Sequence, residues 1–316
     1  MWTDKRFDTE MLRLRIPELN GTSDLVRLDK GYSSDVKYAV YGAGSQPVQI
    51  LRTFDHGQEA GKRIEYENLQ LAAGHGVKCS EPIAFGILPD LELGYILVSY
   101  IEGDEASEAL PRLSERAQFD IGLQAGEQLK LMNSIDCPVQ MASWQDRIMA
   151  KYRRYRSDYA DCGVSIRRES ELFAYIDKHL SGLEGRPNRF QHDDFHPANL
   201  IVKDGALSGV IDFNRCDWGD PVHEFVKVGM FGSEVSVPFS VGQIRGYHGG
   251  REPAEEFWRL YSLYLATTMI SSVVWTLKVV PDQMEEMLGR IHRVLEEDHD
   301  GFAQMMPKWY READFA

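Results

Sequence analysis

Residues 191–202 read QHDDFHPANLIV, and residues 209–214 read GVIDFN. Both stretches place polar side chains directly beside short apolar runs that are typical of buried strands. The turn sequence Lys203-Asp204-Gly205 lies between them, so the two runs are predicted to form a β-hairpin. Such a hairpin returns the chain to the edge it left, which would gather the polar groups of both stretches.

These stretches contain the residue types that a phosphoryl-transfer site needs. One carboxylate accepts the proton of the substrate hydroxyl, while an amide and a second carboxylate hold Mg²⁺ on the nucleotide phosphates. The catalytic loop of protein kinases places its aspartate five residues before its asparagine. Asp194 lies five residues before Asn199 and Asp193 lies six before it, so the spacing selects Asp194 as the base and leaves Asp193 as the alternative. Asn199 and Asp212 are then the predicted Mg²⁺ ligands.

The same residues resemble a known family, the aminoglycoside phosphotransferase and choline kinase group of small-molecule kinases. That family usually shows His-Gly-Asp, then Asn, then Ile-Asp-Phe or Ile-Asp-Trp, and then Gly-Asp-Pro. Here the order is His192-Asp193-Asp194, Asn199, Ile211-Asp212-Phe213 and Gly219-Asp220-Pro221. Asp193 replaces the usual glycine, which adds a negative charge that would raise the pKa of Asp194. Glu224 stands where the family often has an aspartate.

The resemblance extends upstream to the nucleotide-positioning loop. Gly31-Tyr32-Ser33-Ser34-Asp35 looks like the loop between the family's first two strands, so Ser33 and Ser34 are candidate phosphate contacts, with a plain hairpin turn as the alternative. Arg52 stands where kinases place a phosphate-binding lysine. The resemblance implies an ion pair between Arg52 and Glu65, with Glu67 as the competing partner.

A third upstream segment resembles the hinge that joins the two lobes of a kinase. Leu97-Val98-Ser99-Tyr100-Ile101-Glu102-Gly103 follows an apolar strand and ends in polar residues and a glycine. The resemblance implies that backbone groups of Ser99, Tyr100 and Ile101 read the edge of a purine. An ordinary strand end is the alternative.

The pattern of the whole chain predicts an α+β protein with the bilobal, protein-kinase-like fold. Residues 1–102 would form a nucleotide-binding lobe with a five-stranded antiparallel sheet and one helix at 59–74. Residues 103–316 would form a mainly helical lobe that carries the catalytic loop and the acceptor site. The remaining predictions are strands at 25–28, 36–41, 48–52, 83–87 and 95–100, helices at 113–133, 143–159, 169–181, 253–277 and 281–297, and a β-rich island at 199–213.

Composition excludes several other classes of protein. The net charge of −14 argues against nucleic-acid binding, which depends on basic groups, and would suit a cationic ligand. The four cysteines are widely spaced, and the charged N-terminus lacks an apolar signal core, so a cytoplasmic protein is expected. Residues 260–277 carry no charge, but their hydroxyl groups and helical spacing predict a buried helix rather than a membrane span.

The resemblance therefore implies a kinase that uses ATP or GTP with Mg²⁺ and phosphorylates a hydroxyl of a small molecule. An aminoglycoside or another antibiotic, a choline-like amine, an amino-alcohol and a sugar are all candidate acceptors. A catalytically silent nucleotide-binding regulator is the alternative, although Asp194, Asn199 and Asp212 are all retained. A protein kinase is disfavoured, because the glycine triplet and an Ala-Pro-Glu sequence after Asp212 are missing.

Overall fold

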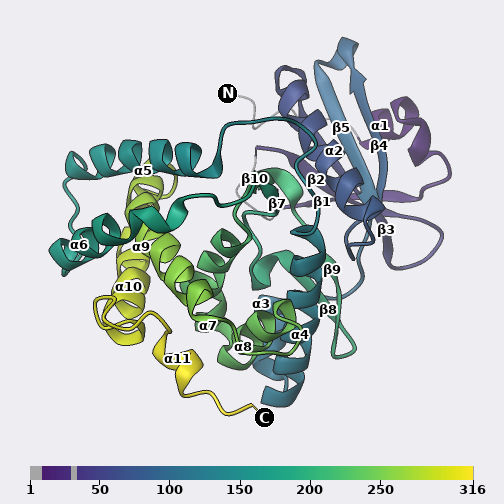
Figure 1. Ribbon diagram of the computed structural model, residues 1–316. Helices are drawn as coiled ribbons and strands as arrows, with labels where there is room; N and C mark the ends of the chain where they lie inside the picture. Colours follow the sequence, from purple (N-terminus) through teal and green to yellow (C-terminus); the bar gives the residue numbers. More distant parts are fainter. Residues whose placement is uncertain (1–8, 30–33, 316) are drawn as a thin grey trace. The chain divides into compact units, whose positions relative to one another are not determined.

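The structure is a computed structural model that describes residues 9–29 and 34–315. The chain divides into two compact units (Figure 1). The first contains the chain up to Gly103 together with Ser208–Arg215, and the second contains Asp104–Leu207 and the chain from Cys216 onward. The sequence places a single break near residue 103. The return of Ser208–Arg215 to the first unit is a feature of the folded chain that a linear division does not contain.

A five-stranded sheet forms the centre of the first unit, with the strand order β1-β2-β3-β5-β4. All neighbouring strands in it run antiparallel. This confirms the predicted antiparallel sheet of five strands, and β2 agrees with the prediction to the residue. The strands are β1 Asp24–Leu28, β2 Val36–Tyr41, β3 Pro47–Asp55, β4 Pro82–Leu88 and β5 Leu93–Ser99.

Helix α2, Glu59–Gly74, follows β3 directly and also has the predicted bounds. A shorter helix, α1 (Thr9–Arg15), contributes Leu12 to the core of this unit, where it packs with Val40, Leu51 and Leu97 of the sheet. Burial of such aliphatic side chains contributes about 1.5–3 kcal/mol each. The strand that carries Arg52 is therefore anchored in a buried core.

The second unit is mainly helical, and its short strands lie on both sides of the catalytic-loop sequence. Strand β7 (Arg189–Gln191) pairs antiparallel with β10 (Asp217–Gly219). A second sheet in the order β6-β8-β9 is formed by β6 (Asp104–Glu105), β8 (Leu200–Lys203) and β9 (Ala206–Val210), of which residues 208–210 belong to the first unit. The helices are α3 Ala106–Ala109, α4 Glu115–Met132, α5 Trp144–Ala160, α6 Glu169–His179, α7 Ser233–Val235, α8 Val237–Tyr247, α9 Glu255–Val279, α10 Met284–His292 and α11 Lys308–Arg311.

Several of these elements differ from the sequence prediction, α8 and α10 among them. Helix α8 was not predicted, and the helix predicted over 281–297 is divided into α10 and a π-helical segment, Arg293–Asp298. Glycine lowers helix propensity by about 1 kcal/mol relative to alanine, and α8 contains Gly242 and Gly246. Its helical state depends on packing against α4, which local propensity does not report.

Glycines on both helices allow the backbones of α4 and α8 to touch. A Cβ atom added at Gly122 would lie 2.2 Å from the Phe239 carbonyl oxygen, and one added at Gly126 would lie 2.1 Å from the Gln243 carbonyl oxygen. Gly242 and Gly246 approach α4 equally closely. Since backbone atoms cannot move aside as a flexible side chain does, these positions require glycine.

We expect Gly126→Ala to lower the free energy of unfolding by about 1–3 kcal/mol, because overpacking forces the two helices apart. This loss should appear despite the higher helix propensity of alanine. Gly289→Ala in α10 is the matched control, since nothing lies within 4 Å of the added Cβ there. Denaturant unfolding of both variants provides the measurement. A Gly126→Ala variant as stable as Gly289→Ala would contradict the close packing.

Helix α9 contains the uncharged segment at 260–277. By length and composition the helix could cross a membrane, but 67% of its most apolar window is buried inside the fold. Tyr261 and Tyr264 are among its fully buried side chains. The core helix of a globular unit shows the same composition, and the predicted burial of this segment is confirmed.

Candidate active site

The catalytic-loop sequence begins at the end of β7 and is held beside the Gly-Asp-Pro sequence. Because β7 pairs with β10, Gln191 lies opposite Asp217, and its Nε2 donates a hydrogen bond of 2.7 Å to the Asp220 carbonyl oxygen. A Cβ at Gly219 would meet the ring of Trp144 and Gln191 Oε1 at less than 2.5 Å, so only glycine fits. This packing fixes where the loop starts.

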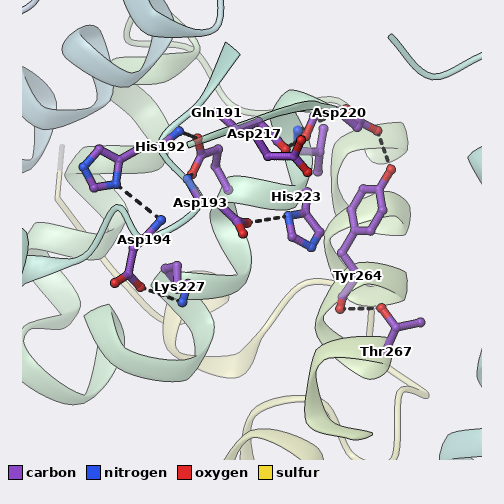
Figure 2. A network of polar contacts seen from close by, with 12 residues as sticks. Gln191, His192, Asp193, Asp194, Asp217, Asp220, His223, Lys227, Tyr264 and Thr267 are labelled. Atoms are coloured by element: carbon purple, nitrogen blue, oxygen red, sulfur yellow. Dashed lines mark hydrogen bonds and ion pairs between the residues drawn. The ribbon is translucent and has the colours of Figure 1, made fainter. Parts of the chain in front are cut away.

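Asp220 braces this region. Its fully buried carboxylate accepts hydrogen bonds from Arg186 Nη2 at 2.9 Å, from the Tyr264 hydroxyl at 2.7 Å and from the Val222 N–H at 3.1 Å. Figure 2 shows the contact between Asp220 and Tyr264. A buried carboxylate with this many donors is satisfied by the protein itself, which leaves it a structural role.

Glu224 holds the first residues of the catalytic loop through their backbone N–H groups. Its carboxylate, which is 1% exposed, accepts the backbone N–H of His192 and, at 3.1 Å, the N–H of Asp193. Burial, followed by the negative charge of Asp193, raises the pKa of Glu224 to about 8. His192 is itself fully buried and accepts the Asp194 N–H at Nδ1, 3.3 Å away, which is a structural role.

The raised pKa of Glu224 predicts a pH-dependent stability. The unfolded carboxyl ionises near its ordinary value of 4.5, whereas the folded one resists ionisation up to about pH 8. The folded state therefore loses stability as the pH rises through this window. Glu224→Gln lacks this titration but leaves one loop N–H without an oxygen, which costs about 1–3 kcal/mol.

We therefore expect the unfolding temperature of the wild type to exceed that of Glu224→Gln most strongly near pH 5, and the difference to shrink towards pH 9. Thermal unfolding at pH 5, 7 and 9 measures it. Glu67→Gln, which changes an exposed carboxylate, serves as the control. A difference that is constant with pH would contradict the assigned pKa direction.

Neighbouring aspartates of the loop point to different partners (Figure 2). Asp193 Oδ1 lies 3.2 Å from His223 Nδ1, while Asp194 Oδ1 accepts a hydrogen bond of 2.7 Å from Lys227 Nζ. Asp193 has a φ of 57°, in the left-handed region where glycine is favoured and aspartate is tolerated. The position therefore accommodates either the aspartate of this chain or the glycine usual at it.

The surroundings of Asp194 overturn one expectation. The charge of Asp193 was expected to raise the pKa of Asp194, but this pKa is lowered. Burial alone would raise it; the His196 ring, 3.5 Å from Oδ1, and the Lys227 ammonium more than compensate and favour the ionised form. The Asp193 carboxylate itself lies 3.2 Å from His223 Nδ1.

Asn199, at the end of the catalytic loop, is hydrogen-bonded to Asp194. Its Nδ2 donates a hydrogen bond of 2.9 Å to the Asp194 carbonyl oxygen and lies 3.3 Å from Asp194 Oδ2. Since the amide nitrogen is directed at Asp194, Oδ1 is the atom that Asn199 can offer to a cation. The five-residue spacing thus places the carboxylate and the amide in contact.

In the first unit, Arg52 of β3 lies among carboxylates. The predicted ion pair with Glu65 of α2 is present, and Arg52 Nη2 also donates to Asp35 Oδ2 at 2.6 Å. Glu65 is 7% exposed, whereas Glu67, the competing partner, is exposed. Lys62 joins the same cluster, 2.6 Å from Asp35 and 3.1 Å from Glu65. The roles of Arg52 and Glu65 towards a nucleotide stay predictions.

Asp212 also lies in the first unit, directly after β9. It adopts a φ of 67°, and its negative charge acts on Arg52. Its Oδ1 atom is buried and has no hydrogen-bond partner among the described residues. A buried carboxylate oxygen normally has a partner, so this atom fits the oxygen ligand that Mg²⁺ requires.

The remaining predicted contacts are more restricted than the sequence suggested. The N–H of Ser99 donates to the Glu81 carbonyl at 2.9 Å and that of Tyr100 to the Val48 carbonyl at 3.0 Å, so these two N–H groups already have acceptors within the protein. Ile101 packs against Gly209. Ser34 is exposed and accepts a hydrogen bond from Gln58 at 3.3 Å, and Ser33 lies outside the described residues.

Sequence reasoning missed the cations that contact the acidic groups. Lys227 follows Asp194 by 33 positions and Lys62 follows Asp35 by 27, so no local motif connects the members of either pair. Across the described part of the chain, no three His, Cys, Asp or Glu side chains are grouped to hold a metal by themselves. A metal here would need the Asn199 amide and ligand oxygens in addition to carboxylates.

Comparison with solved structures shows the same fold at low sequence identity. The GDP complex of wild-type aminoglycoside 2'-phosphotransferase-IIIa is 16% identical, with a TM-score of 0.66 over 90% of this chain and 96% of that chain. The gentamicin complex of APH(2")-IIa is 16% identical, with a TM-score of 0.64 over 94% and 98%. A thermostable APH(4)-Ia mutant in its apo form is 17% identical, with a TM-score of 0.62 over 90% and 97%.

A search of curated proteins finds no match. The fold shared with the solved kinases is the protein-kinase-like fold expected from the sequence. The family model described as the phosphotransferase enzyme family matches residues 24–260, a range that includes Arg52, Asp194, Asn199 and Asp212. A match over most of the chain is decisive, and this chain belongs to the phosphotransferase enzyme family.

Proposed function

We propose that this protein transfers the γ-phosphate of ATP or GTP to a hydroxyl group of a small molecule, with Asp194 as the base. The observation that carries the proposal is the geometry of the loop from Asp194 to Asn199. The carboxylate of Asp194 is 20% exposed and hence reachable by an acceptor, while Asn199 holds its backbone in place. Family membership supports a phosphotransferase reaction, and solved relatives hold GDP, ADP or ATP.

In this mechanism the chain supplies alignment and charge. Asp194 accepts a hydrogen bond from the acceptor hydroxyl and orients its oxygen towards the γ-phosphate. It takes the proton as the new P–O bond forms, while the bond from the γ-phosphorus to the β,γ-bridging oxygen breaks and the nucleoside diphosphate leaves. Lys227 and His196 keep the Asp194 carboxylate ionised and fixed in direction. Because phosphoryl transfer asks for little covalent chemistry by the protein, positioning of this kind supplies most of the rate.

Asn199 and Asp212 are the residues that would hold the metal. The Asp212 Oδ1 atom, buried and without a partner among the described residues, and the Oδ1 atom of Asn199 match the hard oxygen donors that Mg²⁺ prefers. The bound ion would neutralise charge on the phosphates as it develops. Arg52, held by Glu65, is the proposed cation for the phosphate groups.

The proposed acceptor is a hydroxylated amine, of which an aminoglycoside is one example. Solved relatives are complexes with gentamicin, streptomycin or kanamycin. The net charge of −14 favours the approach of such cations. Antibiotic resistance would follow if the acceptor is an antibiotic.

A coupled assay of nucleotide consumption tests the proposal. The purified protein is screened with ATP and with GTP, at fixed Mg²⁺, against hydroxylated amines, aminoglycosides, macrolides and sugars. We expect acceptor-dependent consumption of one nucleotide and a phosphorylated product by mass spectrometry. Tight nucleotide binding without turnover on any acceptor would favour the silent regulator, and absence of both would overturn the nucleotide function.

A further inference from the structure

The ion pair between Arg52 and Glu65 in the first unit is joined by a second carboxylate, that of Asp35, and by a second cation, Lys62. Arg52 donates to Asp35 Oδ2 through Nε at 3.1 Å and through Nη2 at 2.6 Å, and Glu65 takes Nη1. Lys62 Nζ bridges the same two carboxylates, at 2.6 Å from Asp35 Oδ2 and 3.1 Å from Glu65 Oε2. The cluster therefore contains two acids and two bases.

Its members differ in burial. The side chain of Asp35 is 1% exposed, and its Oδ1 atom has no hydrogen-bond partner among the described residues. Burial by itself would raise the pKa of Asp35, but Arg52 and Lys62 lower it, so the group stays ionised. A carboxylate this deep is a permanent counter-ion rather than one that a ligand displaces readily.

Charge counting shows what Lys62 adds. Without it, Arg52 would lie between the carboxylates of Asp35 and Glu65, and the cluster would have a net charge of −1. A negative cluster repels phosphate groups, whose binding needs cations nearby. Lys62 brings the net charge of these four side chains to zero and adds an ammonium group beside the Arg52 guanidinium.

Lys62 also faces open space. It lines a cavity of about 370 Å³ within the first unit. The other lining residues are Gln58, Gly61, Glu65, Asn214 and Arg215. Two cations and two amides on this lining provide N–H donors of the kind that bind phosphate oxygens.

We propose that Lys62 is a second phosphate-binding cation beside Arg52, and that Asp35 is the fixed counter-ion that positions both. The inference rests on the proposed nucleotide function and names residues of its phosphate subsite. Lys62 would contact the β- or γ-phosphate, so its contribution should grow with the number of phosphates on the ligand.

The test compares a nucleoside with its di- and triphosphate by isothermal titration calorimetry at fixed Mg²⁺, using whichever purine series the wild type binds. A hydrogen-bonded charge pair contributes enough to change the affinity about ten- to a hundredfold. We expect Lys62→Met to lower the affinity for the triphosphate by about this factor and the affinity for the diphosphate by less. The affinity for the nucleoside should be unchanged. Arg63→Met is the matched control, because Arg63 pairs with exposed Glu59 on the same helix.

Two further variants make the result specific. Asp35→Asn keeps the shape and one oxygen that can still accept the hydrogen bonds of Arg52 and Lys62, so both cations stay positioned while a negative charge is removed. Triphosphate affinity should therefore rise several-fold, and the double variant Asp35→Asn/Lys62→Met should return towards the wild type. Circular dichroism and thermal unfolding confirm that each variant folds. If Lys62→Met only lowers the unfolding temperature, with equal effects on nucleoside and triphosphate, Lys62 is structural and the inference is wrong. A wild type that binds none of the three ligands contradicts the proposed function instead.

Discussion

Replacing Asp194 with asparagine should lower the turnover number on an accepted substrate by about 10²–10⁴-fold, the range that a general base contributes. This corresponds to about 2.7–5.5 kcal/mol of transition-state stabilisation at about 1.36 kcal/mol per tenfold change. Asparagine keeps the size of the side chain and one oxygen for Lys227, but it cannot accept the proton of the acceptor hydroxyl. Steady-state kinetics with the acceptor found in the screen measures the loss.

The affinity for nucleotide should largely survive Asp194→Asn, because the lost group acts on the acceptor. Asp193→Gly is the matched comparison. Its backbone φ of 57° suits glycine, and its carboxylate contacts His223 rather than Lys227. We expect Asp193→Gly to retain activity within about tenfold. An inactive Asp193→Gly beside an active Asp194→Asn would make Asp193 the base and refute the spacing argument.

Asp212→Asn should reduce turnover by about 10²-fold or more and shift the Mg²⁺ requirement to higher concentration. Metal-held charge stabilises a phosphoryl-transfer transition state by several kcal/mol, and asparagine offers a neutral oxygen in place of a carboxylate. Asparagine is preferable to alanine here, because it tolerates the φ of 67° at this position. Turnover measured across a Mg²⁺ titration reports both changes.

Asp204 provides the control for this experiment. It also has a positive φ, of 50°, but it is exposed in the turn between β8 and β9. Asp204→Asn should leave both the turnover and the Mg²⁺ dependence unchanged. Should Asp212→Asn behave like Asp204→Asn, the metal role of Asp212 would have to be abandoned.

The local sequence pattern was sufficient to predict much of the secondary structure of the first unit. The predicted bounds of β2 and α2 agree with the structure to the residue, because apolar alternation, turn glycines and helical spacing are properties of consecutive residues. The family resemblance implied the pairing of Arg52 with Glu65, with Glu67 as the competing partner, and the structure contains the pair with Glu65. Asp35, the residue before β2, reaches the same guanidinium only through the β2–β3 register.

Sequence patterns predicted less of the second unit, because its structure depends more on packing between segments that are distant in the sequence. Helix α8 contains two glycines that disfavour a helix locally, and it forms because those glycines let its backbone touch α4. Asp193 and Asp194 are neighbours of the same chemical type in the sequence. Asp194 contacts Lys227 and Asp193 contacts His223 because the backbone at Asp193 is left-handed.

By itself, the sequence determined the class of chemistry, because the spacing of Asp194, Asn199 and Asp212 and the motifs around them are local features of the chain. Only the tertiary structure decided which charged groups surround the catalytic loop and Arg52. Lys227, Glu224 and Lys62 act on loop or strand residues that are distant in the sequence. Electrostatic energy depends on separation in space and on burial, and neither quantity is encoded by position along the chain.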